Sequence, residues 1–312
     1  MKSSPIVSSG DPRVFIIVLN WNGFEVTRDC LESLAKIDYP AFSVVLVDNG
    51  STDGSVDRLL QLFPWITAIR NEANLGFTGG NNIGMRFALE KRPDYILLLN
   101  NDTIVSGEFL THLVRAGEED DRIGILNPKI YYESPPDTIW YGGGTFSLWR
   151  GLARHLHMGK RDSPGLDAAR EVNFVTGCAL LIKLRVLESI GLLDERFVLA
   201  FEDADLSIRA RDAGFKAAYV PESKIWHRVS HTFKNNLGKS RRDFYNVRNS
   251  ILIERKHAKP YHWPTYIVCM GTYLAYRTSG YLLRGEFVRI RALYEGLWAG
   301  LSASMHPQGT AI

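Results

Sequence analysis

The sequence has few cysteines and no segment that resembles a signal peptide. Its 312 residues contain three cysteines, Cys30, Cys178 and Cys269, which are far apart and form no CxxC pair. This spacing excludes a disulfide framework and a cysteine zinc site, and it indicates a reducing compartment. The N-terminal stretch MKSSPIVSSGDPR lacks the apolar centre of a signal peptide. We therefore expect residues 1–11 to be a flexible leader.

The sequence also lacks internal repeats, low-complexity runs and a clear membrane span. The stretch PTYIVCMGTYLAYRTSGYLL is apolar, but it includes Arg277 and several tyrosines. A spanning helix needs ~20 predominantly apolar residues. This stretch therefore predicts a packed or interfacial helix.

The net charge is small, +3, but it is unevenly distributed. The segment from Lys224 to His262 contains ten Lys and Arg against Asp243 and Glu254, a local charge of +8 that leaves −5 for the other residues. A basic block beside a more acidic body indicates a phosphate-bearing ligand or an anionic membrane surface. A solvated basic face is the alternative.

What the sequence does contain is a regular alternation of strands and helices. Hydrophobic residues make up 45% and charged residues 23%, which is typical of a globular protein. Buried strands are predicted at VFIIVLN, FSVVLVDNG, ITAIR and YILLL, and helices at TRDCLESLAKI (with Thr27 as N-cap), SVDRLLQLF and GGNNIGMRFALEK. This order predicts an α/β fold with a doubly wound, mostly parallel sheet.

The later part of the chain is less regular. Residues 130–170 are rich in Gly, Pro, Trp and His, and we expect loops over the sheet edge there. Strand and helix return in VNFVTGCALLIKLRVLESIG, a helix follows in FEDADLSIRARDAG, and another strand is FKAAYV. From residue 233 to 312 we expect a basic and aromatic helical C-terminal extension.

Polar side chains follow four successive predicted strands. The candidate ligand-binding residues are Asn20 and Asn22, then Asp48, Asn49 and Ser51, then Asn74, Gly76 and Asn81, then Asn100 and Asn101. Ligands of such sheets bind outside the carboxyl ends of the strands, so these loops predict one shared site. Ordinary turn chemistry could explain any one of them.

The glycine fingerprint of dinucleotide binding is missing after the first strand. That turn reads NWNGFE, with one glycine instead of GxGxxG, so NAD binding is disfavoured. The glycine-rich run LGFTGGNNIG comes two strands later. Its backbone N–H groups could bind an anion at a helix N-terminus, or its glycines could allow close helix–strand packing.

Asp102 and His227 are the candidate metal ligands. Asp102 ends a buried strand, where a carboxylate can bind Mg²⁺ or Mn²⁺ together with substrate phosphates and water; capping the next helix, near Gly107, is the alternative. His227, in KIWHRVSH, would make a mixed N/O site, which suits Mn²⁺ better than Ca²⁺, although a lone histidine is usually structural. The basic residues nearby could neutralise a diphosphate: His231, Lys234, Arg241, Arg242 and Arg248.

The stretch FEDADLSIR places Glu202, Asp203 and Asp205 in the first turn of a helix. Acids at this position offset the helix dipole. Three acids in four positions also repel one another, and a carboxylate facing a cleft could be a general base whose basicity its neighbours and partial burial raise.

These motifs together resemble those of inverting glycosyltransferases of family 2, in particular bacterial rhamnosyltransferase-type enzymes of cell-wall and surface-polysaccharide assembly. The resemblance rests on VLNWNG, VDNGSTDGS, NLGFTGGNNIG, LLLNNDT, the segment from VTGCALL to RDAGF, and IWH, and it covers residues 12–232. It implies a GT-A fold, a nucleotide-diphosphate sugar donor, a divalent cation (Mg²⁺ or Mn²⁺) and inversion at the anomeric carbon.

The resemblance also implies roles for individual residues. Asp48, Asn49 and Ser51 match the nucleoside-binding loop. Asn74, Gly76 and Asn81 match the segment along the donor. Asn100, Asn101 and Asp102 match the DXD metal motif, but the first acid is replaced by Asn, so one carboxylate is missing. Asp203 matches the catalytic base of the ED motif, and His227 matches a metal-binding histidine.

We accordingly expect transfer of rhamnose from dTDP-rhamnose to a glycan or lipid-linked acceptor, with UDP-sugars such as UDP-galactofuranose as alternative donors. The expected location is the cytoplasm, with peripheral contact to the inner face of the membrane as an open alternative. A nucleotidyltransferase would need a basic, glycine-rich loop after the first strand, and NWNGFEVTR is a poor match. A non-catalytic nucleotide- or glycan-binding module is the other alternative.

Overall fold

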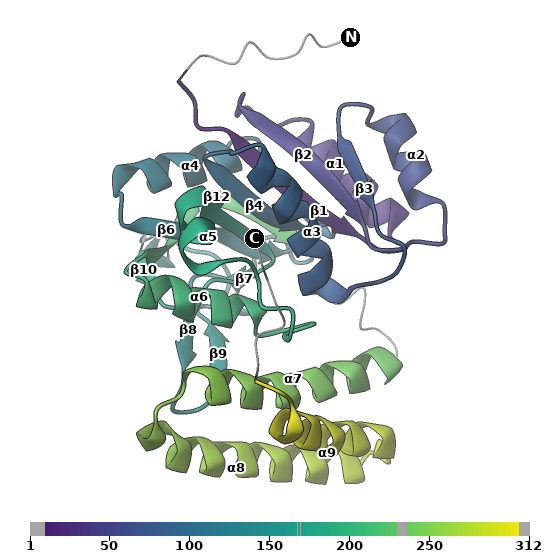
Figure 1. The fold of residues 1–312 in the computed structure, drawn as a ribbon, viewed down its shortest axis with the longest axis vertical. Helices are drawn as coiled ribbons and strands as arrows, with labels where there is room; N and C mark the ends of the chain where they lie inside the picture. The colour runs from purple at the N-terminus through teal and green to yellow at the C-terminus, as the bar shows by residue number, and fades with distance from the viewer. Residues whose placement is uncertain (1–9, 167, 169, 230–235, 306–312) are drawn as a thin grey trace.

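The computed structural model describes residues 10–166, 168, 170–229 and 236–305. A ten-stranded sheet lies at its centre, with the strand order β10-β12-β6-β11-β4-β1-β2-β3 and with β5 and β7 paired to β12 and β6. Helices α3, α5 and α6 cover the face of the sheet nearer the viewer in Figure 1, and α1 and α4 pack on the other face. The C-terminal helices α7, α8 and α9 lie together at one end of the molecule (Figure 1).

The bounds of the elements are as follows. The strands of the sheet are β1 (Val14–Asn20), β2 (Phe42–Asp48), β3 (Thr67–Arg70), β4 (Tyr95–Asn100), β5 (Thr103–Val105), β6 (Ile123–Tyr132), β7 (Ile139–Tyr141), β10 (Arg170–Val172), β11 (Ala179–Lys183) and β12 (Lys216–His227). A separate hairpin is formed by β8 (Gly144–Ser147) and β9 (Leu152–His155). The helices are α1 (Phe24–Leu34), α2 (Ser55–Leu62), α3 (Gly76–Glu90), α4 (Phe109–Glu119), α5 (Leu184–Ile190), α6 (Glu202–Asp212), α7 (Asn236–His257), α8 (Trp263–Leu282) and α9 (Phe287–Ser302).

The first four strands form the parallel part of the sheet. Strand β1 pairs in parallel with both β2 and β4, and β3 pairs in parallel with β2. The central residues of β1, β2 and β4 are almost all buried, as expected of apolar strands covered by helices on both faces, whereas β3 at the end of the sheet is partly exposed. Strand β11 runs antiparallel between β4 and β6, and β6 and β12 pair in parallel. The predicted α/β fold with a mostly parallel central sheet is confirmed.

The glycines of α3 allow this helix to lie close against the sheet. A Cβ on Gly84 would lie 2.5 Å from Ile17 Cγ2, and one on Gly80 would lie 2.5 Å from Leu19 Cδ1. Both distances are too short for a real contact, so any larger side chain would push α3 away from β1. Close helix–strand packing therefore explains these two glycines of the run LGFTGGNNIG.

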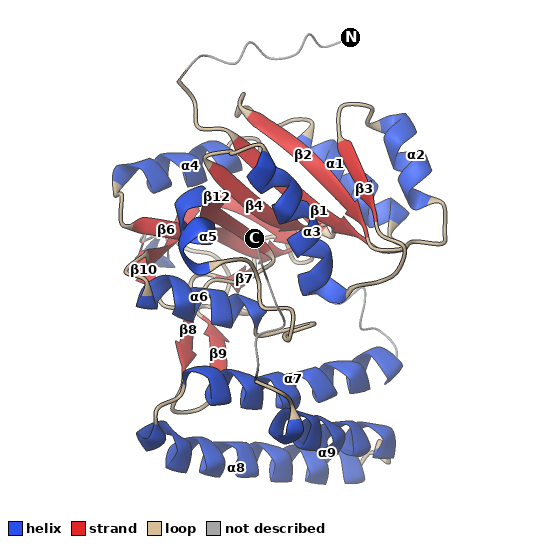
Figure 2. Cartoon of the chain, viewed as in Figure 1, coloured by secondary structure: helices blue, strands red, loops and turns tan. Residues whose placement is uncertain are grey.

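Several local expectations are wrong. Residues 130–170 are not only loops, because β6 continues to Tyr132 and three short strands and a bridge follow. Figure 2 shows β8 and β9 as a hairpin below the sheet. Thr27 does not cap α1, which begins at Phe24; its hydroxyl instead donates to Asn20 Oδ1 (2.8 Å). Asp102 does not cap α4, whose N-cap is Glu108.

One face of α7 packs into the main core, and the three C-terminal helices also form a small hydrophobic core of their own. Leu252 and Ile253 of α7 belong to the main core, whereas Val247 and Ile251 pack with Leu293 of α9 and with α8. Helix α7 therefore connects the sheet to the other two helices. Within the part of the chain that the structure describes, no helix is long and apolar enough to cross a membrane.

Candidate active site

The ends of β1, β2 and β4 bring the predicted polar residues to one rim of the sheet. In the strand register Asn20 is the partner of Asp48, and Leu19 is the partner of Asn100. Asn20 Nδ2 donates to Ser55 Oγ (2.9 Å) and Ser51 Oγ (3.2 Å), and it lies 3.4 Å from Asp48 Oδ1. The expected convergence of these loops is therefore seen, although Asn20 is fully buried and its amide is used to hold the loops together.

Asn49 organises the neighbouring loop in the same way. Its Nδ2 donates to Asn74 Oδ1 (2.9 Å) and to the Gly76 carbonyl (3.0 Å), and its Oδ1 accepts from the Leu75 N–H (3.0 Å). A Cβ on Gly76, whose φ is +75°, would meet Val198 Cγ1 at 2.6 Å. Glycine is thus required where this loop crosses the segment before α6.

The remaining donor-binding candidates also make internal contacts. Asn22 accepts from the Thr52 N–H (2.8 Å), Asn81 Nδ2 donates to the Phe77 carbonyl (2.9 Å), and Asn101 Nδ2 donates to Thr27 Oγ1 (2.8 Å). These bonds set the shape of the rim. Contact of any of these residues with a donor stays a prediction.

Asp102 and His227 come together although they are far apart in sequence. The short strand β5, which directly follows Asp102, pairs antiparallel with the end of β12, and Thr103 is the partner of His227. This pairing places His227 Nε2 3.1 Å from Asp102 Oδ1. Burial lowers the pKa of His227, whereas the side chains of Cys178 and Asp102 raise it. The net result is a pKa above the usual value.

The ligand atoms that Asp102 and His227 offer, a carboxylate oxygen and an imidazole nitrogen, are suitable for a divalent cation. Asp102 Oδ1 is buried and contacts the ring of His227, whose buried Nδ1 has no hydrogen-bond partner among the described residues. A carboxylate oxygen with an imidazole nitrogen is a donor set that Mn²⁺ accepts. Among the described residues no group of three or more His, Cys, Asp or Glu side chains could hold a metal. A cation here would have two protein ligands and would need phosphate oxygens or water for the rest of its shell.

Asp203 lies in the first turn of α6 and is partly exposed. Its Oδ2 accepts from the Gly177 N–H (3.1 Å) and its Oδ1 from the Ala204 N–H (2.8 Å). Burial raises the pKa of Asp203 to about 6, and these N–H groups act in the opposite direction. A carboxylate with such a pKa is a suitable general base near neutral pH.

The two other acids of this turn have different surroundings. Glu202 is buried, and burial together with Asp203 and Asp205 raises its pKa well above the usual range. Asp205 is fully buried. Burial raises the pKa of Asp205, but the opposing effect of His257, Arg209 and Lys256 is larger. The net result is a pKa well below the usual range. Of the three acids, only Asp203 combines a raised pKa with partial exposure.

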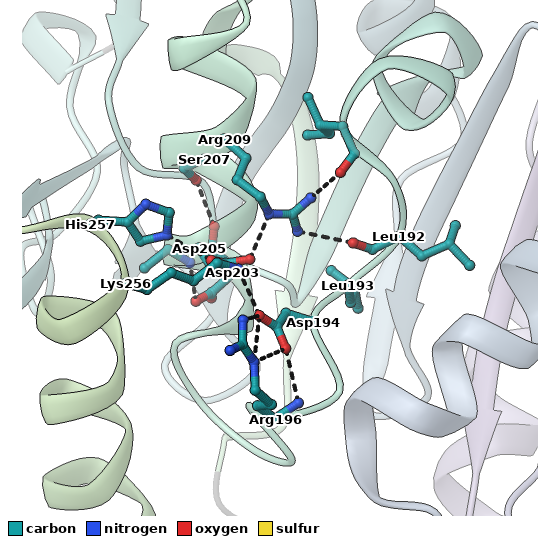
Figure 3. Close-up of polar contacts among 12 residues, drawn as sticks. Leu192, Leu193, Asp194, Arg196, Asp203, Asp205, Ser207, Arg209, Lys256 and His257 are labelled. Atoms are coloured by element: carbon teal, nitrogen blue, oxygen red, sulfur yellow. Dashed lines mark hydrogen bonds and ion pairs between the residues drawn. The ribbon is translucent and has the colours of Figure 1, made fainter. Parts of the chain in front are cut away.

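Asp205 connects α6 to α7 through ion pairs. Its Oδ2 accepts from Arg209 Nε (2.7 Å), and its Oδ1 lies 2.6 Å from Lys256 Nζ and 2.7 Å from His257 Nε2. Lys256 also contacts Asp194 (2.6 Å). Figure 3 shows this network directly beside Asp203. The extension therefore contacts the helix that bears the candidate base.

A strained turn precedes α6. Ala200 and Phe201 have φ angles of +66° and +71°, in the left-handed region that non-glycine residues rarely adopt. Asn249 of α7 donates to the carbonyls of Leu199 and Ala200 (both 2.8 Å) and holds the turn. Asn249 was not among the predicted site residues. In the sequence it stands out only as a polar residue beside the apolar run SILI in NVRNSILI.

The metal pair and the candidate base belong to the same rim. Strand β11 leads out of this rim, and just before it the carbonyl of Cys178 accepts from the Asn100 N–H (2.8 Å). The preceding residue, Gly177, is the one whose N–H binds Asp203. Cys178 thus contacts Asn100, which lies at the end of β4 and two residues before Asp102. The adjacent Gly177 contacts the carboxylate of Asp203.

The basic candidates are only partly brought to the site. Arg248 Nη1 donates to the Arg196 carbonyl (2.8 Å) and to Asn249 Oδ1 (2.7 Å), so it supports the loop before α6, and contact with a diphosphate stays a prediction. Arg241 and Arg242 are exposed on α7. His231 and Lys234 lie outside the described residues.

Comparisons with known proteins agree on one family. The family profile described as "Glycosyltransferase like family 2" matches residues 12–246. The N-acetylglucosaminyl-diphospho-decaprenol L-rhamnosyltransferase of Mycobacterium tuberculosis is 28% identical over 222 residues, which are 65% of this chain and 71% of that protein. The dTDP-rhamnosyl transferase RfbF of Shigella flexneri is 24% identical over 225 residues, 70% of this chain and 72% of that protein.

Another relative is much longer. The uncharacterized protein y4gI of Sinorhizobium fredii is 26% identical over 239 residues, and the match spans 71% of this chain but a quarter of that protein's length. Among solved structures, the mannosyltransferase PcManGT of Pyrobaculum calidifontis, in complex with GDP-Man and Mn²⁺, has a TM-score of 0.59 at 16% identity and covers 94% of this chain and 88% of its own. This likeness shows the fold.

Proposed function

This chain belongs to glycosyltransferase family 2 and has the GT-A type fold, and from that premise we propose that it transfers a sugar from a nucleotide-diphosphate donor with inversion at the anomeric carbon. The observation that supports the proposal is the contact of two consecutive residues with both candidate groups' surroundings. Gly177 binds Asp203, and Cys178 binds Asn100, two residues before the Asp102 that lies beside His227.

In the proposed mechanism Asp203 accepts the proton of an acceptor hydroxyl while that oxygen forms a bond to the anomeric carbon. The bond between the anomeric carbon and the diphosphate oxygen breaks, and the nucleoside diphosphate leaves with the electron pair. A pKa of about 6 leaves most of the Asp203 carboxyl ionised at neutral pH while keeping it basic. Positioned base catalysis of this kind contributes typically ~10²–10⁴-fold.

Asp102 and His227 would hold the divalent cation, Mg²⁺ or Mn²⁺, whose charge offsets that of the diphosphate. The buried carboxylate of Asp102 beside His227, whose Nδ1 has no hydrogen-bond partner among the described residues, supports this assignment. Asp48 and Ser51, at the end of β2, would hold the nucleoside. The neighbouring loop with Asn74, Gly76 and Asn81 would lie along the donor.

For the donor we propose dTDP-rhamnose. Support comes from the names of two relatives, one a dTDP-rhamnosyl transferase and one an L-rhamnosyltransferase. UDP-sugars, including UDP-galactofuranose, are the alternative donors.

For the acceptor we propose a glycan or a lipid-linked sugar of surface-polysaccharide or cell-wall synthesis, with the protein peripheral on the inner face of the cell membrane. The mycobacterial relative is named for a decaprenol-linked acceptor, and the basic tract of this chain would favour anionic lipid.

The test is a screen of nucleotide sugars for release of nucleoside diphosphate, with Mn²⁺ or Mg²⁺ and then with EDTA. We expect turnover with dTDP-rhamnose that EDTA abolishes, and a loss of about 100-fold or more in kcat for Asp203→Asn. Asp212→Asn, an exposed acid of the same helix, is the matched control. Transfer that stays within a few-fold in Asp203→Asn would refute the base assignment, and full activity in EDTA would remove the cation.

A further inference from the structure

The outer face of α8 is exposed, largely apolar and free of charge. The structure describes α8 throughout, and its exposed residues are Pro264, Thr265, Ile267, Val268, Gly271, Thr272, Ala275, Tyr276, Ser279 and Leu282. They recur every three or four residues and so lie on one side of the helix. Tyr266, Leu274 and Tyr281 form the opposite, buried side.

The corner between α8 and α9 extends this face. Leu283 is 89% exposed, and Phe287 and Val288 at the start of α9 are 66% and 67% exposed. Further along α9, Trp298 is 73% exposed. We call Ile267, Val268, Tyr276, Leu282, Leu283, Phe287 and Val288 the outer apolar surface. In Figure 1 α8 forms the end of the molecule farthest from the sheet.

The surroundings of this surface are basic. Residues 236–305 contain eleven Lys and Arg against four Asp and Glu, a charge of +7, whereas the whole chain has +3. Arg284, in the corner between the two helices, pairs with Glu286 (3.6 Å), and Arg291, exposed on α9, pairs with Glu295 (2.6 Å). Seven of the eleven basic residues belong to the tract of residues 224–262, which includes α7. Two copies of such a surface would repel each other, so the charge argues against a dimer through this face.

We propose that the outer apolar surface docks on an anionic lipid bilayer, with α8 lying in the plane of the interface. A helix of 20 residues is about 30 Å long, and an amphipathic helix lies with its apolar face ~5–10 Å into the boundary between headgroups and acyl chains. Tyrosine and tryptophan favour this boundary because one part of each ring system is apolar and another forms hydrogen bonds.

This inference rests on the membrane location in the proposed function and deepens it, because it names the surface. The outer apolar surface on α8 and α9 supplies the apolar contact. The basic tract of residues 224–262, which includes α7, supplies most of the attraction to anionic headgroups. Basic residues near such headgroups are attracted within about a Debye length.

The experiment is co-sedimentation of the full chain with vesicles of phosphatidylcholine containing about one third phosphatidylglycerol, without donor or acceptor. The test variant is the double substitution Val268→Asp and Leu283→Asp, at two exposed positions whose change leaves the buried side of α8 intact. Leu62→Asp, at an exposed leucine of α2, is the matched control. Thermal unfolding and light scattering accompany each measurement.

We expect wild type and Leu62→Asp to bind the vesicles, and the double variant to bind at least about tenfold more weakly, because it puts charge into the apolar interface. Binding should also fall in pure phosphatidylcholine and at high salt. Absence of binding by the wild type, equal binding by the double variant, or a dimer that the double variant dissociates would each overturn the inference. Since neither donor nor acceptor is present, its failure would leave sugar transfer untouched, and inactivity in the donor screen would leave docking untouched.

Discussion

The carboxyl group of Asp203 contributes to the pH dependence of stability and, as the proposed base, to that of catalysis. Its pKa in the folded protein is about 6, whereas an unperturbed aspartate has about 3.9. The folded protein thus binds this proton more tightly than the unfolded chain. Ionisation of Asp203 therefore lowers the free energy of unfolding as pH rises from about 4 to about 6, by at most about 3 kcal/mol.

Asp203→Asn removes this ionisation. We expect the free energy of unfolding of the variant minus that of wild type to increase between pH 4 and pH 7, because only wild type loses stability by ionising Asp203. Urea titrations at both pH values measure the change. The comparison across pH cancels the loss of one N–H acceptor in the variant. A difference that is constant from pH 4 to pH 7 would contradict the raised pKa. In the wild type, kcat should fall below about pH 6 as the base takes up its proton.

The Asp102–His227 pair predicts a metal-dependent stabilisation. With saturating Mn²⁺ and a nucleoside diphosphate we expect a higher melting temperature, because ligand at about 100 times its Kd stabilises by ~2.7 kcal/mol. Asp102→Asn loses a charged ligand, so Mn²⁺ should bind at least about tenfold more weakly, which thermal unfolding and calorimetry both measure. Asp212→Asn is again the control. Equal Mn²⁺ affinity in Asp102→Asn would place the cation elsewhere.

At the scale of elements, Asn249 of α7 positions α6. It donates to two consecutive carbonyls of the left-handed turn before Glu202, and such strained conformations cost of order 1–3 kcal/mol per residue unless their surroundings hold them. Asn249→Ala should let this turn relax and move Asp203, lowering kcat about tenfold with little change in donor KM. Steady-state kinetics with the donor found in the screen measure both constants.

Arg255→Ala is the matched control for Asn249. Arg255 lies on the same helix and donates to the carbonyls of Gly300 and Ala303, away from α6. Its loss should lower stability comparably but leave kcat within about twofold. If the two variants lose kcat equally, Asn249 acts through general stability rather than by positioning the turn.

The elements that the sequence predicted well are those with long, uniform patterns. β1, β2 and β4 are continuous apolar runs, and α6 was correctly predicted at FEDADLSIRARDAG. The short strands β7, β8 and β9 were missed because three or four residues interrupted by glycine carry no detectable period. Their pairing is decided by tertiary contacts: Tyr141, for example, donates to the Phe174 carbonyl (2.9 Å).

The position of the candidate site residues at one rim of the sheet was predictable, but their hydrogen-bond partners were not. The polar residues after successive strands could be assigned to one rim, because parallel strands end at the same edge. That Asn20 and Asn49 use their amides inside the protein could not be seen, since hydrogen-bond partners depend on side-chain directions. The contact of Asn249 with the turn before α6 depends on how α7 packs, which no local pattern contains.

At the scale of the whole molecule, α7 joins the catalytic sheet to the C-terminal helices. The predicted boundary between the domain of residues 12–232 and the extension of residues 233–312 leaves α7 outside the catalytic domain. Yet Lys256 and His257 contact the buried Asp205, Lys256 also contacts Asp194, and Leu252 and Ile253 fill part of the main core. Physically, α7 completes the domain that carries the site.

A chain ending at residue 232 should therefore be strongly destabilised. It leaves Asp205 buried with only Arg209 as partner, and loss of a partner from a buried ion pair costs ~3–5 kcal/mol. It also exposes the surface that Leu252 and Ile253 cover. Circular dichroism and thermal unfolding of the truncated chain measure the effect, and a cooperative transition at the wild-type temperature would show that residues 12–232 fold independently.

A second truncation, after residue 258, separates the role of α7 from that of the other helices. This chain keeps Asn249, Lys256 and His257, but it loses α8 and α9 and so exposes the small core around Val247 and Ile251. If α7 completes the catalytic domain, this chain should unfold at a higher temperature than the one ending at residue 232 and should bind nucleoside diphosphate with Mn²⁺. Equal instability of the two chains would instead mean that α7 is held in place only by α9, and that the extension folds as a three-helix unit before it supports α6.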